Sequence, residues 1–296
     1  MPWAAALANQ SAVARRLLGQ STRLSQNLIG QLLNELGFDP ALKAELQALA
    51  AQPGGARADA LIDVVHRNPD STPAAITLLL ALRRSGQLDA AAPAGHRPAA
   101  IPRRIVQYWP EPPTGEVAQG MEICAALHPG WDHVRFDFAA ALDYVAAHFP
   151  SEVLTACDRA ARLGQFSAVF RLAVLSREGG WFIDGAVRCL APLESLPRPD
   201  AVLWGLQDEV SALSDRVIGC APGEAVVDRA LSRAVEAINR GDNDIPWLAT
   251  GPGLLTRAFA QVLASREADR GAWLADRFVA DRVALRGLLI PDYVTS

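Results

Sequence analysis

Helical periodicity dominates the first part of the chain. Apolar residues recur there at a spacing of three or four positions, which places them on one face of a helix. The recurring positions are Leu28, Leu32, Leu36, Leu42, Leu46, Leu49, Leu61, Val64, Val65, Ile76 and Leu82. Gly, Pro and Asn residues interrupt the pattern, and Asp39 and either Asp70 or Ser71 are suited to be N-caps. The pattern predicts a bundle of four or five short helices over residues 1–85.

The pattern changes after an Ala-, Pro- and Gly-rich segment at 86–100, whose composition is typical of a linker. From residue 101 onward, short apolar runs alternate with helical patterns. The strand-like runs are 101–109, 131–137, 181–187, 201–209, 216–222 and part of 278–291, and the helical ones are 116–129, 138–149, 167–180, 223–241 and 250–264. This alternation predicts an α/β domain over residues 101–296, with a mainly parallel sheet and helices on both faces. In such sheets ligands bind beyond the carboxyl ends of the strands.

Composition and charge narrow the class of protein. Half of the 296 residues are apolar and the formal net charge is -4, which is typical of a globular protein and unlike a nucleic-acid-binding one. The four cysteines lack the spacing of a zinc site, and we expect them to be reduced core thiols. The first residues lack the features of a secretory signal, and no apolar run reaches the roughly 20 residues of a membrane span. We therefore expect a cytoplasmic protein, either free or held at the inner face of a membrane by a partner.

Asp184 is the first candidate for chemistry. It follows Trp181, Phe182 and Ile183 and precedes a glycine, which places it at the carboxyl end of an expected strand. Asp-Gly is a common turn dipeptide, so a structural turn explains this aspartate on its own. A carboxylate at a strand end can instead bind a hard cation or a sugar hydroxyl, and a second acid two positions later would complete such a pair. The residue at that position is Ala186.

The order of residues around Asp184 resembles a known pattern. A serine, an arginine, a leucine, a Gly-Gly pair, an aromatic residue and an aspartate follow one another as Ser167, Arg171, Leu175, Gly179, Gly180, Phe182 and Asp184. Three further segments match in the same order, namely IPRRIVQYWP, HPGWDHVRFD, and VIGCAPGEAVVDRAL with ATGPGLLTRAF. Residues 101–260 thereby resemble the DXD-containing nucleotide-sugar glycosyltransferases, which include the Och1-type mannosyltransferases and the clostridial glycosylating toxins.

The resemblance implies a GT-A fold and a UDP- or GDP-sugar donor held with Mn²⁺ or Mg²⁺. It implies that Trp109 stacks on the nucleotide base, that Arg171 faces the donor's phosphates or sugar, and that Asp184 contacts the ribose or the metal. The same implied donor site includes further motif positions, namely Gln107, Ser167, Gly179 and Gly180. Two alternatives stay open: Trp109 as a core aromatic residue and Arg171 as one member of an ordinary ion pair.

Three departures fall on positions where the family carries function. Ala168 and Ala186 stand where the family has aspartates, and Val106 replaces a histidine. An alanine side chain can neither bind a cation nor accept a hydrogen bond from a sugar, so the DXD motif is degenerate. Asp208 and Glu209 follow another expected strand and are candidates to orient an acceptor; the alternative is a solvated pair in a loop.

Three functions are consistent with these residues. The first is a glycosyltransferase of the hexosyltransferase type, with a metal-independent donor site and with Asp184, Asp208 and Glu209 as candidate catalytic residues. Its acceptor would be a saccharide, a lipid-linked sugar, a metabolite or a protein. The second is a nucleotide-binding protein that no longer transfers sugar. The third is a scaffold whose N-terminal helices bind a partner or pair two copies, unless they only pack on the following domain. The sequence favours the first.

Overall fold

The structure is a computed structural model that describes residues 39–52, 54–88, 99–162, 165–208, 210–242 and 244–291. Three helices come first, α4 (Pro40–Ala50), α5 (Gly54–Arg67) and α6 (Thr72–Arg84). The strands of the main sheet are β1 (Arg104–Tyr108), β2 (Asp132–Phe136), β3 (Gly180–Ile183), β5 (Val202–Gln207), β6 (Ala212–Cys220) and β7 (Arg277–Ala280). A separate ribbon pairs β4 (Val187–Cys189) with β8 (Leu289–Pro291). The later helices are α7 (Gly115–Leu127), α8 (Phe138–His148), α9 (Ser151–Arg162), α10 (Phe166–Glu178), α11 (Ala225–Arg240), α12 (Pro246–Ala249), α13 (Pro252–Ala264), α14 (Arg270–Ala275) and α15 (Arg282–Leu285).

The main sheet has the strand order β2-β1-β3-β6-β5-β7. β1 is parallel to β2 and β3, and β5 is parallel to β7, whereas β6 is antiparallel to both of its neighbours. Five strands therefore share one direction and β6 alone runs against them. This confirms the predicted α/β class with a mainly parallel sheet. The central strand β3 is apolar throughout because both faces of the sheet are covered, and all of its residues are buried.

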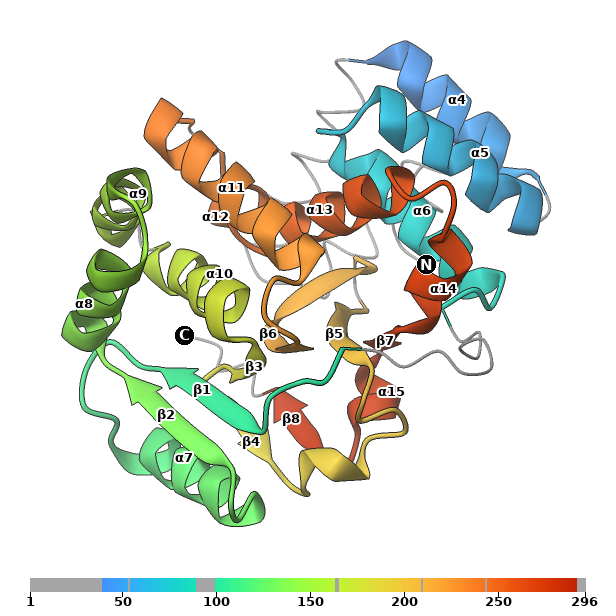
Figure 1. The fold of residues 1–296 in the computed structure, drawn as a ribbon. Helices are drawn as coiled ribbons and strands as arrows, with labels where there is room; N and C mark the ends of the chain where they lie inside the picture. The colour runs from blue at the N-terminus through green and yellow to red at the C-terminus, as the bar shows by residue number, and fades with distance from the viewer. Residues whose placement is uncertain are drawn as a thin grey trace, which may run out of the picture.

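Two hydrophobic layers enclose the sheet. On one face, Val106 and Phe182 belong to a large core that includes residues of α8, α9, α10, α11 and α13. On the other face, Ile105 and Trp181 belong to a smaller core together with residues of α7 and β4. Figure 1 shows α8 to α11 above the sheet and α7, β4 and β8 below it. Among the described residues, no helix is long and apolar enough to cross a membrane.

The single strand predicted at 181–187 is in fact divided. β3 ends at Ile183, and the chain turns before β4 begins at Val187 in the separate ribbon. The turn forms because the Asp184 carboxylate accepts a hydrogen bond from the Ala186 N–H (3.0 Å) and the Asp184 carbonyl accepts one from the Val187 N–H (2.8 Å). Asp184 therefore lies at the carboxyl end of a buried strand, as predicted. The last strand-like run, 278–291, is likewise divided into β7, α15 and β8.

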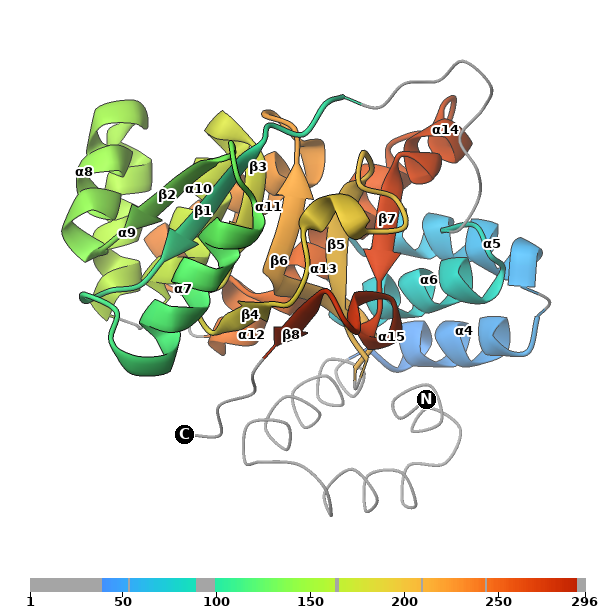
Figure 2. The same ribbon diagram turned by 90° about the horizontal axis from the view of Figure 1, so that it is seen from below.

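The helices α4, α5 and α6 follow the predicted periodicity. Asp39 caps α4 by accepting from the Leu42 N–H (2.9 Å), and Ser71 rather than Asp70 caps α6 by accepting from the Ala74 N–H (3.3 Å). Figures 1 and 2 show the three helices beyond β7, at the end of the sheet opposite α8 and α9. Their leucines share one core with α13. The rest of the predicted bundle, residues 1–38, lies outside the described residues, and the predicted division into domains stays a prediction.

Candidate functional site

A cavity of about 410 Å³ opens beyond the carboxyl end of β1. Five separate segments meet there: the end of β1, the first residue of α8, the end of α9, the start of α10 and the turn after β3. Half of its lining residues are aromatic, and the full lining consists of Tyr108, Trp109, Pro110, Phe138, Ala161, Phe166, Ser167 and Asp184. Three of the predicted donor-site residues, Trp109, Ser167 and Asp184, are therefore brought together from distant positions in the chain.

Aromatic rings form the floor of this cavity. The ring centroids of Phe138 and Phe166 are 4.7 Å apart, and those of Tyr108 and Phe166 are 5.7 Å apart. Phe138 is unusual among large apolar residues because 38% of it is exposed. Burial, and then the nearby Asp137, raise the pKa of Tyr108, so its hydroxyl remains protonated and available as a donor. The Phe138 and Tyr108 rings are inclined to the Phe166 ring by 56° and 47°, so the cavity presents apolar ring faces in several orientations together with a few polar groups, a lining that suits an aromatic ligand.

Gly185 explains how Trp109 reaches the cavity. A Cβ atom built on Gly185 would lie 2.8 Å from Trp109 Cε3 and 2.8 Å from Met121 Cε. The indole therefore packs directly over the backbone of the turn that follows Asp184. This contact couples the position of the predicted base-stacking residue to the turn that presents the carboxylate.

The two carboxylate oxygens of Asp184 have different surroundings. Oδ1 accepts the hydrogen bond from the Ala186 N–H, which is the turn contact (3.0 Å). Oδ2 lies 3.8 Å from Nη2 of Arg171. The side chain is 27% exposed and lines the cavity. The turn and the ligand-binding interpretations are thus compatible, because one oxygen serves the turn and the other is directed toward Arg171.

Arg171 is not among the residues that line the cavity; it lies next to Asp184, the acidic residue of the lining. Its side chain is only 5% exposed, its Nη1 donates to Oδ2 of Asp215 (2.6 Å), and its Cζ lies 4.7 Å from the Phe182 ring centroid. A buried guanidinium needs such partners because an uncompensated charge is costly in an apolar setting. Since two carboxylates and an aromatic ring already surround it, Arg171 is placed to fix Asp184 and Asp215 in position.

Asp215 was not among the residues selected from the sequence, and a β-bulge places it here. Trp204 pairs with Ile218, but the next residue of β5, Gly205, pairs with Ser214, so residues 215–217 are extra in β6. The bulge lies against the end of β3, where the Arg216 carbonyl accepts from the Asp184 N–H (2.8 Å). Bulges re-aim side chains and are frequent beside functional sites.

The sequence carried a weak signal for Asp215. The predicted strand began at residue 216, which left the preceding residues without a role. The triplet Ser214-Asp215-Arg216 is nevertheless a polar interruption inside an otherwise apolar strand. A polar run at such a place marks an irregularity in pairing, which is what the structure shows.

The other predicted site residues lie elsewhere. Gln107 is fully buried in β1, and neither atom of its amide has a hydrogen-bond partner. Gly179 and Gly180 lie at the amino end of β3, away from the strand ends that face the cavity, with φ values of 64° and 91°. Asp208 follows β5 and faces Arg83 at 3.9 Å. Glu209 lies outside the described residues.

The two glycines have a packing role at their end of β3. A Cβ atom on Gly179 would lie 2.5 Å from the Pro222 nitrogen, and one on Gly180 would lie 2.8 Å from the Arg104 carbonyl oxygen. Both positions also have positive φ, which disfavours any residue with a side chain. Backbone packing therefore accounts for the Gly-Gly pair without a ligand.

The residues present do not fit a divalent cation. Within the described part of the chain, no three His, Cys, Asp or Glu side chains are grouped so that they could hold a metal. Asp184 and Asp215 both face the cation Arg171, and Ala186 supplies no ligand.

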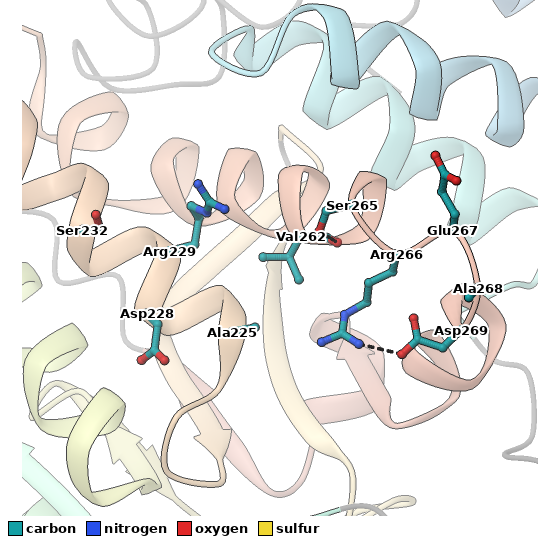
Figure 3. A pocket seen from close by; sticks show the side chains of 10 residues that line it. All are labelled: Ala225, Asp228, Arg229, Ser232, Val262, Ser265, Arg266, Glu267, Ala268 and Asp269. Atoms are coloured by element: carbon teal, nitrogen blue, oxygen red, sulfur yellow. Dashed lines mark hydrogen bonds and ion pairs between the residues drawn. The ribbon is translucent and has the colours of Figure 1, made fainter.

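A larger hollow of about 690 Å³ lies on another part of the surface, between α11 and the connection from α13 to α14 (Figure 3). Its charged residues are of both signs, and Arg266 is bound to Asp269 (2.7 Å). None of the sequence-predicted site residues lines it. The smaller cavity is the better candidate because it lies at the strand ends and gathers the predicted residues.

Comparisons with known proteins give a distant likeness. No family model matches the chain, and a search of curated proteins finds no match. A solved structure described as "PaToxG Glycosyltransferase" is similar, with 16% sequence identity and a TM-score of 0.47. The similarity covers 64% of this chain and 79% of that one. A likeness at this level is too distant to assign an activity, which has to be argued from the residues of this chain.

Proposed function

We propose that the chain is a glycosyltransferase that binds a nucleotide-sugar donor in the cavity between β1 and α10 and transfers its sugar to an acceptor. One observation carries this proposal. Trp109 belongs to the segment IPRRIVQYWP, whereas Ser167 and Asp184 stand at the two ends of a second motif, and all three line a single cavity beyond the strand ends. Residues that serve only in packing are not expected to come together around an open cavity.

Each group in the cavity has a role in this proposal. The nucleotide base stacks among the rings of Trp109 and Phe138, and Oδ2 of Asp184 accepts a hydrogen bond from a ribose or sugar hydroxyl. Arg171 and Asp215 act as positioning residues that hold the Asp184 carboxylate. The donor would be a UDP- or GDP-sugar.

The start of α10 favours the diphosphate. Phe166 and Ser167 are its first residues and line the cavity, and Gln165 makes no side-chain cap on the helix. Helix N-termini attract anions because their free N–H groups and the helix dipole both carry partial positive charge. Together with the poor fit to a cation, this supports metal-independent binding of the donor.

A second candidate function is nucleotide-sugar binding without transfer. Two observations favour it. Arg171 is already compensated by two carboxylates, and one oxygen of Asp184 is committed to the turn. Both leave fewer groups to stabilise a departing nucleoside diphosphate.

Calorimetric titration with UDP-glucose and GDP-mannose, each with Mn²⁺ and with EDTA, tests both candidates, together with an assay for released nucleotide. The first predicts binding that persists in EDTA, and slow release of UDP or GDP. Binding without release would support the second candidate. The absence of binding to either donor would refute both.

Two variants locate the binding. Trp109→Ala should weaken binding about tenfold or more, since base stacking is worth roughly 1–3 kcal/mol. Trp131→Ala is the matched control. Trp131 precedes the amino end of β2, whereas Trp109 follows the carboxyl end of β1. The Trp131 indole N–H donates to Glu194 (2.8 Å). Asp184→Asn keeps the turn acceptor and removes the charge, so binding should fall while the melting temperature changes little. Equal losses for both tryptophans would count against the assigned cavity.

A further inference from the structure

Two thiols meet on the face of the sheet covered by α7 and the β4–β8 ribbon. Cys124 of α7 and Cys189 of β4 are 0% and 2% exposed, and their Sγ atoms are 2.7 Å apart. They belong to the smaller core, beside Ile183 and Val187. Neither thiol has a role in the proposed donor site.

The elements that carry the two thiols are tied to each other on both sides of the pair. His128 Nδ1 donates to the Cys124 carbonyl (2.7 Å), while its Nε2 accepts from the Leu193 N–H (2.9 Å). At the other end of α7, Glu116 pairs with Arg188 (2.6 Å). These contacts fix the spacing between α7 and β4. The two sulfur atoms are therefore held close together by the packing of the two elements.

The surroundings of the thiols distinguish Cys124 from the other cysteines. The S–H of Cys189, and then His128 and His133, lower the pKa of Cys124. Burial raises the pKa of Cys157 to about 12 and also raises that of Cys220. Cys124 is therefore the cysteine that forms a thiolate most readily, and Cys189 lies in contact with it.

We propose that Cys124 and Cys189 form an intramolecular disulfide that links α7 to β4. Because both thiols are buried, a small disulfide such as oxidised glutathione reaches them while the chain refolds or when α7 and β4 open locally. The Cys124 thiolate then attacks one sulfur and displaces a glutathione thiolate, which leaves a mixed disulfide. Cys189 then loses its proton and attacks the Cys124 sulfur, and the second glutathione thiolate leaves. The protein loses two protons and two electrons, and the glutathione disulfide takes them up and is reduced to two thiols. A bond of about 2.05 Å requires only a small approach of the two sulfurs.

The link would restrain the turn that carries Asp184. β4 follows this turn directly, and the Val187 N–H donates to the Asp184 carbonyl (2.8 Å). The proposal does not depend on the proposed function, because a disulfide between these residues can be present whether or not the cavity binds a donor.

Redox titration of the full chain tests the proposal. The protein is equilibrated, and in parallel refolded from urea, in buffers of increasing oxidised-to-reduced glutathione ratio; it is then quenched in acid, denatured and alkylated. We expect two of the four cysteines to lose alkylation and the mass to fall by two hydrogens. Tryptic mapping should join the peptide that contains Cys124 to the peptide that begins at Cys189.

Single variants provide the controls. Cys189→Ser should stop the reaction at a mixed disulfide between Cys124 and glutathione, whereas Cys157→Ser should leave the intramolecular link unchanged. Full alkylation of all four cysteines in oxidising buffer, or a link that includes Cys157 or Cys220, would overturn the proposal. The mapping of the unmodified chain decides the question even where a variant fails to fold.

Discussion

At the scale of single residues, the position of the Asp184 carboxylate in the cavity depends on the charges around Arg171. One buried guanidinium contacts Asp215 at 2.6 Å and Asp184 at 3.8 Å. Removing one partner from such a cluster leaves a charge without compensation, whereas removing both is less costly. The three side chains therefore form a unit, and the effects of substituting them on the free energy of unfolding should not be additive.

A double-mutant cycle measures this unit. Arg171→Met should lower the free energy of unfolding by about 2–4 kcal/mol, because two carboxylates lose their partner. Asp215→Asn alone should cost less, since its side chain is 23% exposed and water can solvate the change. We expect a coupling energy of about 1–3 kcal/mol between the two positions, measured by urea denaturation. Strictly additive losses of unfolding free energy would contradict the interaction inferred between Arg171 and Asp215.

Gly185 gives a second test at this scale. Gly185→Ala should displace the Trp109 ring, because the added methyl would lie 2.8 Å from Trp109 Cε3. We expect weaker donor binding, by about tenfold, and a change in tryptophan fluorescence. Gly120→Ala in α7 is the matched control, since its Cβ meets nothing within 4 Å and φ is not in the left-handed region. It should leave binding unchanged.

At the scale of elements, irregular pairing decides where the functional side chains point. Local patterns predict α7, α8, α10, α11 and α13 because apolar residues recur at helical spacing in each of these segments. α9 was not predicted, because its buried face consists mostly of small residues, among them Ala156, Cys157 and Ala160, and its overall hydrophobicity is low. The bulge that presents Asp215 was not predictable either, since it arises from pairing between distant strands rather than from local sequence.

The contact between α13 and β6 tests how this irregular strand is held. Thr256 Oγ1 accepts from the Leu213 N–H (2.9 Å) and donates to the Pro252 carbonyl (2.7 Å). Thr256→Val should cost about 1–3 kcal/mol of unfolding free energy, because it leaves a buried N–H unsatisfied. Thr77→Val is the control: Thr77 Oγ1 only donates to the Pro73 carbonyl within α6 (2.7 Å), so its loss should be small. Thermal denaturation of both variants gives the comparison.

At the scale of the whole molecule, the helices before the sheet and the α/β part share a core. The leucines of α5 and α6 belong to the same hydrophobic cluster as Leu255 and Phe259 of α13. Polar contacts cross the same boundary, among them Arg257 with Thr72 (2.7 Å), Gln261 with the Pro69 carbonyl (2.6 Å) and Arg83 with Asp281 (2.8 Å). This packing favours the hypothesis that these helices support the following domain over the hypothesis that they bind a separate partner.

Truncation tests whether these helices support the α/β part. A chain that begins at residue 99 would expose the face of α13 on which α5 and α6 pack. Since the whole stability of a domain is about 5–15 kcal/mol, we expect it to lose its cooperative melting transition or to aggregate. Circular dichroism melting and size-exclusion chromatography would show this. A truncated chain that melts cooperatively at the original temperature would support an independent α/β domain and a separate role for the helices.

The reversed direction of β6 has a consequence for how such proteins are recognised. Because β6 runs against its neighbours, the residues with which it begins lie beside the residues with which β3 ends. A carboxylate can therefore reach Arg171 from either segment, and Asp215 stands about thirty positions along the chain from Asp184. A search pattern that requires both acids within a few residues of each other will pass over a chain arranged in this way, although the two acids share one arginine in space.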